Sequence, residues 1–196
     1  ADPVQTQITN GMIHVYGHPS AEPESIAQAL GGTWAQEVHS DSDVAVFAIN
    51  PSAGVDQLTI EQWSQLDEYQ IPRIVVVTHL EKLEADFDDA VMIANRVFAP
   101  MATPYLVLHD EDGLPIALIS LVDLTIIDYS TNPFTTRACE PEHETLVQEF
   151  RDEYLELIEA SGEGAFAAGL LFPAIPVWIE KGIGVDIVKD YIQQLQ

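Results

Sequence analysis

The sequence is poor in cysteine and in basic residues, and it contains no long hydrophobic run. Its only cysteine is Cys139, so an internal disulfide and a cysteine-rich metal site are both excluded. No apolar stretch is long enough to span a bilayer. With 196 residues, of which 47% are hydrophobic and 20% charged, we expect one globular domain with a small lobe, in a reducing, cytoplasmic location.

The deficit of basic residues is the largest of these features. Lys and Arg number 7 against 32 Asp and Glu, which gives a formal net charge of -25. Such a surface repels nucleic acid, anionic membranes and free nucleotide phosphates, so we expect none of them as a direct partner. Two interpretations stay open: the acidity keeps the protein soluble, or it attracts a basic protein partner.

The first half of the chain alternates short apolar runs with helical patterns, which is typical of an α/β fold. The runs at 43–49 and 73–78 are rich in β-branched residues, as in strands that are buried on both faces of a parallel sheet. Thr59 and Gln62 are spaced as a capping box at the start of a helix. The pattern predicts strands at 12–16, 43–49 and 73–78, and helices at 25–30, 59–69 and 85–98.

The second half begins with a different pattern. Alternating runs over 104–129, broken by Glu111-Asp112-Gly113, predict an antiparallel meander. A long helix is expected over 140–159, with Pro141 in its first turn. One face of that helix is acidic and carries Glu149, Asp152, Glu153, Glu156 and Glu159. A last strand at 176–179 and a helix at 185–195 close the chain.

Eleven positions in the stretch 43–98 form a dense pattern: Gly54, Val55, Gln57, Trp63, Tyr69, Pro72, Arg73, Ile74, Ala85, Asp86 and Phe87. With this pattern the stretch resembles the GTPase domain of elongation factor G. The resemblance implies an α/β fold, with a truncated P-loop GTPase-like parallel sheet, flanking helices and an inserted α+β subdomain. It assigns residues 11–99 and 172–196 to the core and 100–171 to the insertion, and the chain is then either a lone domain or a fragment.

The phosphate-binding loop of that family is altered in this sequence. Aligning Gly17 with the first glycine of GxxxxGK[ST] places Glu22 at the second glycine, Pro23 at the lysine and Glu24 at the hydroxyl residue. Proline removes an N–H donor, and two carboxylates stand where the polyphosphate would lie. At ~4 Å and an effective dielectric of about 20, each like-charge contact costs on the order of 4 kcal/mol.

The base-reading and switch motifs of the family are altered as well. Thr78, His79 and Glu81 replace Asn, Lys and Asp of NKxD, and only residues 31–42 separate the first helix from the next family strand, where switch I and the magnesium loop belong. We therefore expect a non-catalytic pseudo-GTPase with no catalytic residue, cofactor or metal. The degenerate site comprises Gly17, His18, Glu22, Pro23, Glu24, Thr78, His79 and Glu81.

The resemblance leaves the first core strand as an exposed edge, which favours pairing with another chain and hence a homodimer. Residues 4–9 alternate apolar and polar and precede Asn10-Gly11, the preferred hairpin turn. We expect 4–9 to form a hairpin strand that covers this edge. A loose N-terminal tail is the alternative.

The acidic face of the long helix has two interpretations, a solvated surface or a docking surface for a basic protein. The resemblance names one partner, the basic C-terminal domain of the ribosomal stalk protein. A basic partner unrelated to translation and a GTPase with unconventional nucleotide contacts stay open as alternatives. A His/carboxylate metal site near His18 and His79 is conceivable, but no ligand spacing is diagnostic.

Overall fold

The main sheet is built from short strands whose residues are apolar on both faces, so that helices can cover both sides. The structure, a computed structural model, describes residues 12–82 and 86–195. All pairings in this sheet are parallel, and the strand order is β2-β1-β3-β4-β10-β5. The strands are β1 Ile13–Tyr16, β2 Thr33–Trp34, β3 Val44–Ile49, β4 Arg73–Val77, β5 Met101–Ala102 and β10 Phe172–Pro176. The predicted α/β class is confirmed.

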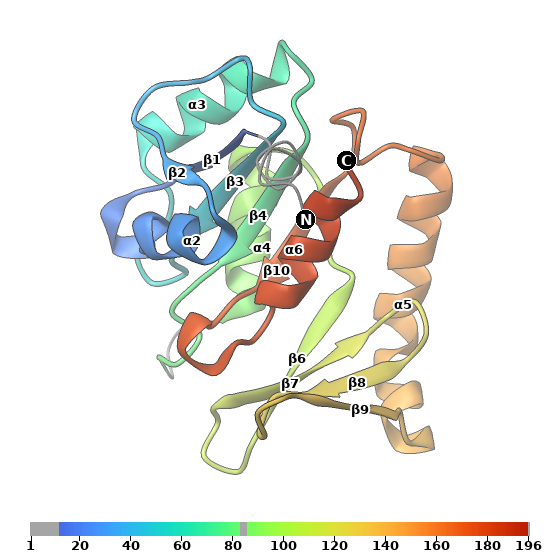
Figure 1. Ribbon diagram of the computed structural model, residues 1–196. Coiled ribbons are helices and arrows are strands. Elements are labelled where there is room, and N and C mark those ends of the chain that lie inside the picture. Colours follow the sequence, from blue (N-terminus) through green and yellow to red (C-terminus); the bar gives the residue numbers. More distant parts are fainter. Residues whose placement is uncertain (1–11, 83–85, 196) are drawn as a thin grey trace, which may run out of the picture.

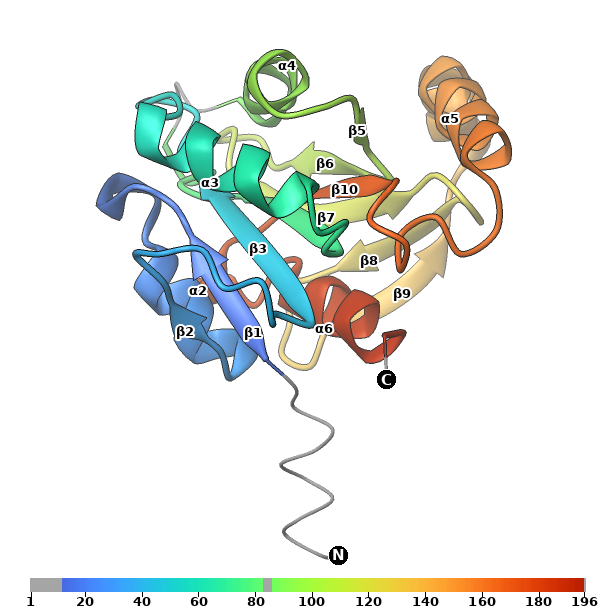
Figure 2. The same ribbon diagram turned by 90° about the horizontal axis from the view of Figure 1, so that it is seen from above.

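Helices cover both faces of this sheet (Figures 1 and 2). One face packs against α2 (Pro23–Leu30) and α6 (Val185–Gln193), in a core that includes Val46 and Val76. The other face packs against α3 (Gln57–Asp67) and α4 (Phe87–Val97). No helix in the described part of the chain is long and apolar enough to cross a membrane.

A second, antiparallel sheet lies beside the first (Figure 1). Its strands, in order, are β6 Tyr105–His109, β7 Pro115–Ser120, β8 Thr125–Asp128 and β9 Thr135–Ala138. The long helix α5, Pro141–Ser161, packs on one face through Val147 and Tyr154. The expected meander is present with one additional strand, and the domain boundaries stay a prediction. Met101–Ala102, which we expected at the start of the insertion, pairs with β10 in the main sheet.

Two predicted element ends are wrong. The N-cap of α3 is Asp56, so Thr59 stands inside the helix and its hydroxyl donates to the Asp56 carboxylate instead of capping. The last strand is Phe172–Pro176 instead of 176–179, because Ile179–Lys181 turns into the short 3₁₀ helix η2. Residues 171–177 are almost continuously apolar, and such a run does not indicate where pairing stops.

The expectation that β1 is the edge of the sheet is also wrong. β2 pairs with it at His14 and Val15, and the Ala35 N–H donates to the Val15 carbonyl at 2.8 Å. The segment after β2 is held by His14, whose Nδ1 lies 2.7 Å from Ser42 Oγ and whose ring stacks on His39 at 4.1 Å. Burial, and then repulsion from His39, lower the pKa of His14. The predicted hairpin strand 4–9 lies outside the described residues.

Candidate functional site

Three loops meet at the carboxyl ends of β1, β4 and β10, where parallel α/β sheets bind their ligands. They enclose a cavity of about 170 Å³. Its lining residues come from the start of α2, from the loop after β4 and from the loop after β10: Glu22, Ser25, Ile26, Thr78, His79, Glu81, Val177, Trp178, Ile179 and Glu180. None of these is Lys or Arg.

Backbone N–H groups of the loop after β1 donate hydrogen bonds to acceptors within the same loop. Gly17 lies so close to β3 that a Cβ there would stand 2.8 Å from the Ala48 carbonyl oxygen. In the 3₁₀ turn η1, Pro19–Ala21, the N–H of Ala21 donates to the His18 carbonyl at 2.9 Å. The N–H of Ser20 donates to His18 Nδ1 at 3.1 Å. These N–H groups are therefore not directed at a ligand.

Glu22 ends this loop in a left-handed conformation, with φ 58° and ψ 48°. Glycine adopts such a backbone most easily, and the resemblance places a glycine of the phosphate-binding loop at this position. The Glu22 N–H donates back to the Pro19 carbonyl at 3.0 Å. Pro23 begins α2 and has no N–H to offer, and Glu24 follows it, exposed, in the first turn. The carboxylate of Glu22, by contrast, reaches the cavity.

The loop after β4 joins the other two loops. The Thr78 hydroxyl lies 3.0 Å from the carbonyl oxygen of Ala21 and 3.2 Å from that of Ile49, so it links the first loop to β3. His79 has φ 59°, and its Nδ1 lies 3.2 Å from Glu81 Oε1. Its Nε2 is buried without a hydrogen-bond partner, 4.0 Å from Glu22 Oε2. The imidazole thus stands between two carboxylates.

The loop after β10 closes the cavity. Trp178 and Ile183 exchange two backbone hydrogen bonds of 3.0 Å across the turn that contains η2. This turn brings Trp178, Ile179 and Glu180 to the cavity wall, and the Lys181 ammonium lies 6.0 Å from the Trp178 ring centre. Glu180 was not among the predicted site residues. The rule that loops after parallel strands meet could have found it.

The structure thus brings together four of the eight residues assigned to the degenerate site. Glu22, Thr78, His79 and Glu81 line the cavity, whereas Gly17, His18, Pro23 and Glu24 do not. Across residues 12–82 and 86–195, no group of three His, Cys, Asp or Glu side chains is placed to hold a metal ion. The cavity presents three carboxylates, one imidazole, two hydroxyls and the indole ring of Trp178. Such a lining suits a cation better than a phosphate.

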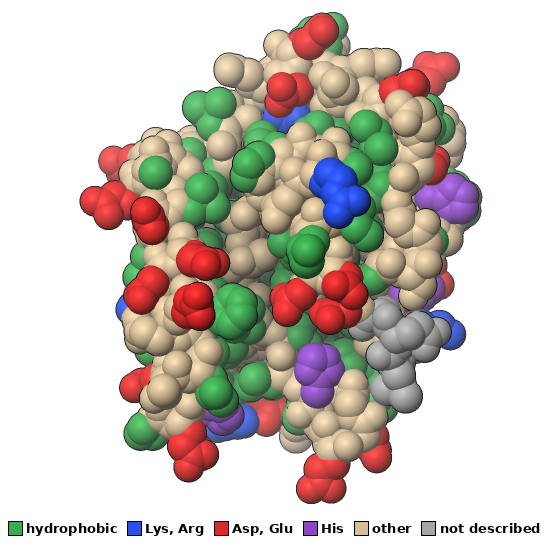
Figure 3. All heavy atoms as spheres, turned by 180° about the vertical axis from the view of Figure 1, so that it is seen from behind, with side chains coloured by type: hydrophobic (Ala, Val, Ile, Leu, Met, Phe, Trp, Pro, Cys, Tyr) green, Lys and Arg blue, Asp and Glu red, His purple; other side chains and the backbone are tan. Residues whose placement is uncertain are grey.

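The second group of predicted site residues lies on α5. All five side chains, those of Glu149, Asp152, Glu153, Glu156 and Glu159, are exposed. They follow one stripe of the helix, since each lies three or four residues from another member of the set. Acidic side chains are also frequent on the face shown in Figure 3, which carries few basic ones.

The comparisons with known proteins point to one family. An elongation factor G-like protein of Mycobacterium tuberculosis is 30% identical over 167 residues, which cover 73% of this chain and 23% of that protein. Elongation factor G of Cereibacter sphaeroides is 40% identical over 83 residues, or 42% of this chain and 12% of that protein. No protein-family model matches the chain.

A solved structure agrees with these relatives. The crystal structure of a Thermus thermophilus protein superposes with a TM-score of 0.69 at 26% identity, over 80% of this chain and 27% of that chain. The chain spans less than a third of the length of each of these proteins. In sequence and in fold, the chain is an elongation factor G-like domain.

Proposed function

We propose that the chain is a non-catalytic binding module, a pseudo-GTPase on an elongation factor G-like frame that does not bind guanine nucleotide. The lining of the cavity between the three loops carries this proposal. Its charged side chains are Glu22, Glu81 and Glu180, with no Lys or Arg among the described lining residues. A polyphosphate there would meet carboxylates, each contact costing on the order of 4 kcal/mol at ~4 Å and an effective dielectric of about 20.

Two further observations support the proposal. The N–H groups of Ser20, Ala21 and Glu22 are engaged within the first loop, whereas a phosphate cradle needs free N–H donors. The cavity of about 170 Å³ is also smaller than ordinary ligand pockets, which hold roughly 300–1,000 Å³. Only thirteen residues, 31–43, separate α2 from β3, and they include β2, which leaves little room for a nucleotide-sensing switch.

Titration with nucleotides tests this proposal. We expect no binding of GTP, GDP or guanosine tetraphosphate at micromolar concentrations in the presence of magnesium. Tryptophan fluorescence, read against a Trp178→Phe variant, provides a local readout beside calorimetry, because Trp178 stands in the cavity wall. An intact translation-factor GTPase in the same buffer is the positive control. Micromolar affinity for any of the three nucleotides would make the alternative, a GTPase with unconventional contacts, the better description.

We propose further that the acidic stripe of α5 docks a basic protein partner in the cytoplasm, with the basic C-terminal domain of the ribosomal stalk protein as the first candidate. The five exposed carboxylates support this, because complementary charge speeds association and selects partners. Relatives named elongation factor G support the connection with translation. A basic partner unrelated to translation is the second candidate, favoured by the overall charge of -25.

Neutralising part of the stripe tests the docking surface. The variant Glu149→Gln/Asp152→Asn/Glu156→Gln is expected to co-sediment with ribosomes at least about fivefold less than the original chain at moderate salt, because three charge contacts are lost. The matched control removes three exposed carboxylates elsewhere, Glu37→Gln/Glu61→Gln/Glu68→Gln, and keeps the same net charge. Equal losses in both variants would indicate a non-specific charge effect. Absence of ribosome binding by the original chain would favour the unrelated partner.

A further inference from the structure

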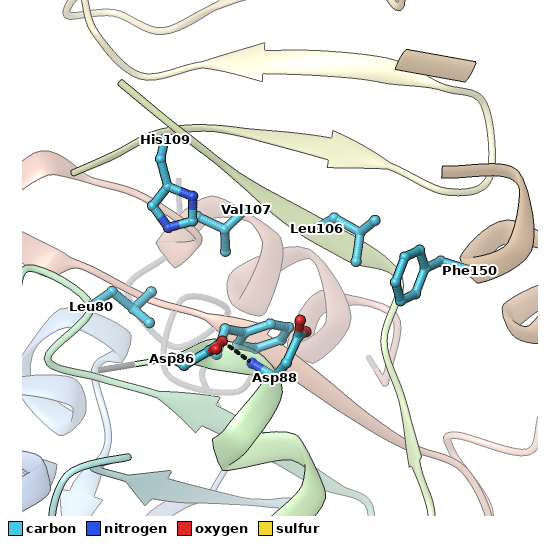
Figure 4. Close-up of a pocket in the computed structure, with 8 residues that line it drawn as sticks. Leu80, Asp86, Asp88, Leu106, Val107, His109 and Phe150 are labelled. Carbon is cyan, nitrogen blue, oxygen red and sulfur yellow. Dashed lines mark hydrogen bonds between the residues drawn. The ribbon is translucent and has the colours of Figure 1, made fainter. Parts of the chain in front are cut away.

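A second cavity lies between the start of α4 and α5. It reaches the loop after β4 through Leu80, which does not line the cavity of the candidate site. It measures about 330 Å³ and opens at the edge strand β6. In Figure 4, Phe150 of α5 and Leu106 of β6 stand on one side of the cavity, and Asp86 and Asp88 at the start of α4 stand on the other. Figure 2 shows α4 and α5 nearly end-on, so their axes are roughly parallel. The cavity is lined by the start of α4, by β6 and by Phe150 of α5, and we call it the groove between α4 and α5.

The helices on either side of the cavity expose apolar side chains, of which Phe150 lines the cavity itself. Phe150 is 45% exposed, and Leu146, one helical turn before it, is 72% exposed. Met92 on α4 is 60% exposed. Phe87 is buried, and Leu106 is half-buried beside it in the cavity lining. Exposed aromatic side chains at the rim of a cavity are common anchors of protein interfaces.

The opposite wall of the groove is negatively charged. Asp86 caps α4, and its carboxylate accepts a hydrogen bond of 2.9 Å from the Asp88 N–H. Burial, and then repulsion from Asp86 and Asp89, raise the pKa of Asp88, and His109 opposes this effect. A cation in the groove would stabilise the ionised form of Asp88. The groove thus combines an apolar side with an anionic side.

We propose that the groove between α4 and α5 binds a basic amphipathic helix of a partner protein. An apolar side chain of that helix would enter the cavity against Phe150, and a Lys or Arg one turn away would reach Asp86 and Asp88. Helices bind such grooves through anchors at helical spacing, and charge complementarity selects a basic one. The proposal goes beyond the proposed docking stripe, because none of its five carboxylates lines this cavity.

A synthetic amphipathic peptide made of Leu, Lys and Ala is the probe, with its scrambled form as reference. Fluorescence anisotropy is expected to show micromolar binding of the amphipathic peptide and weaker binding of the scrambled one. Phe150→Ala is expected to weaken binding by about fivefold or more, as the loss of an anchor does. Phe134→Ala is the matched control, since Phe134 is 43% exposed and lies outside the groove, and it should leave binding unchanged.

The charged side of the groove is tested separately. The variant Asp86→Asn/Asp88→Asn should weaken binding and reduce its salt dependence, and it should stay folded because Asn caps helices as well as Asp does. Circular dichroism of each variant verifies the fold. Equal affinity for the scrambled peptide, unchanged binding by Phe150→Ala, or no binding at all would overturn the proposal. Ribosome binding that persists in those cases would leave the docking stripe on α5 standing.

Discussion

Replacing Arg73 with alanine is expected to lower the free energy of unfolding by about 4 kcal/mol or more. That is a large share of the roughly 5–15 kcal/mol by which domains of this kind are stable. The change is measured by urea denaturation of the original chain and the variant.

The expected loss follows from the position of the guanidinium group. Arg73 is fully buried, and its guanidinium lies 4.4 Å from the ring centre of Trp63 and 4.5 Å from that of Phe172. It donates to the carbonyl oxygens of Ile71 at 3.0 Å, Trp63 at 3.3 Å and Gly169 at 3.4 Å. Alanine leaves a cavity beside the two rings and buried carbonyls without donors, and each such carbonyl costs about 1–3 kcal/mol.

Asp67→Asn separates this explanation from a simple ion pair. Asp67 accepts a hydrogen bond of 2.7 Å from Arg73, but its side chain is 64% exposed. Solvent screens such a pair, so the amide should cost less than about 1 kcal/mol. If Asp67→Asn were as destabilising as Arg73→Ala, the ion pair, and not the rings and carbonyls, would be the source of the stability.

The strands at the centre of the sheet could be predicted because their apolar sequences are compatible only with burial on both faces of the sheet. Val44–Ile49 and Arg73–Val77 are buried at every position. Each strand begins and ends within one residue of its predicted bounds. Helices α2, α4 and α5 were found from their spacing of apolar residues, with ends displaced by one or two residues. Burial on both faces is thus encoded locally.

Elements that depend on tertiary contacts could not be predicted. β2 has two residues, Thr33–Trp34, and exists because β1 offers free backbone groups beside it. β9, Thr135–Ala138, is exposed at every position, so no apolar pattern reveals it. Such short or exposed strands are stabilised by their neighbour and leave no periodic signature of their own.

The candidate site likewise has a part that the sequence predicts and a part that depends on tertiary structure. The resemblance pointed to Glu22, His79 and Glu81, because sequence motifs of the family mark the first two loops. Glu180 reaches the cavity through the 3₁₀ turn η2 after β10, a conformation that no sequence motif predicted. Two of the three carboxylates that line the cavity could therefore be predicted from the sequence. The third, that of Glu180, was found only in the structure.

Gly184→Ala is expected to destabilise the protein by about 3 kcal/mol or more and to disturb the third loop of the candidate site. Gly184 has φ 78°, and a Cβ there would lie 2.0 Å from the backbone oxygen of Pro176. Backbone of β10 would have to move, together with the turn from Trp178 to Ile183 that stands over the cavity. Urea denaturation gives the stability, and the emission of Trp178, read against a Trp178→Phe variant, reports the local change.

Gly182→Ala is the matched control two residues away in the same turn. Gly182 has nearly the same backbone, with φ 71°, but a Cβ there would meet nothing within 4 Å. Alanine at 182 therefore only has to adopt the left-handed conformation, which lowers the free energy of unfolding by on the order of 1 kcal/mol. It should leave the Trp178 emission unchanged. Equal losses at 182 and 184 would mean that backbone conformation alone requires glycine, and that the close approach to Pro176 does not. A larger loss at 184 means that contact with β10 holds the third loop against the cavity.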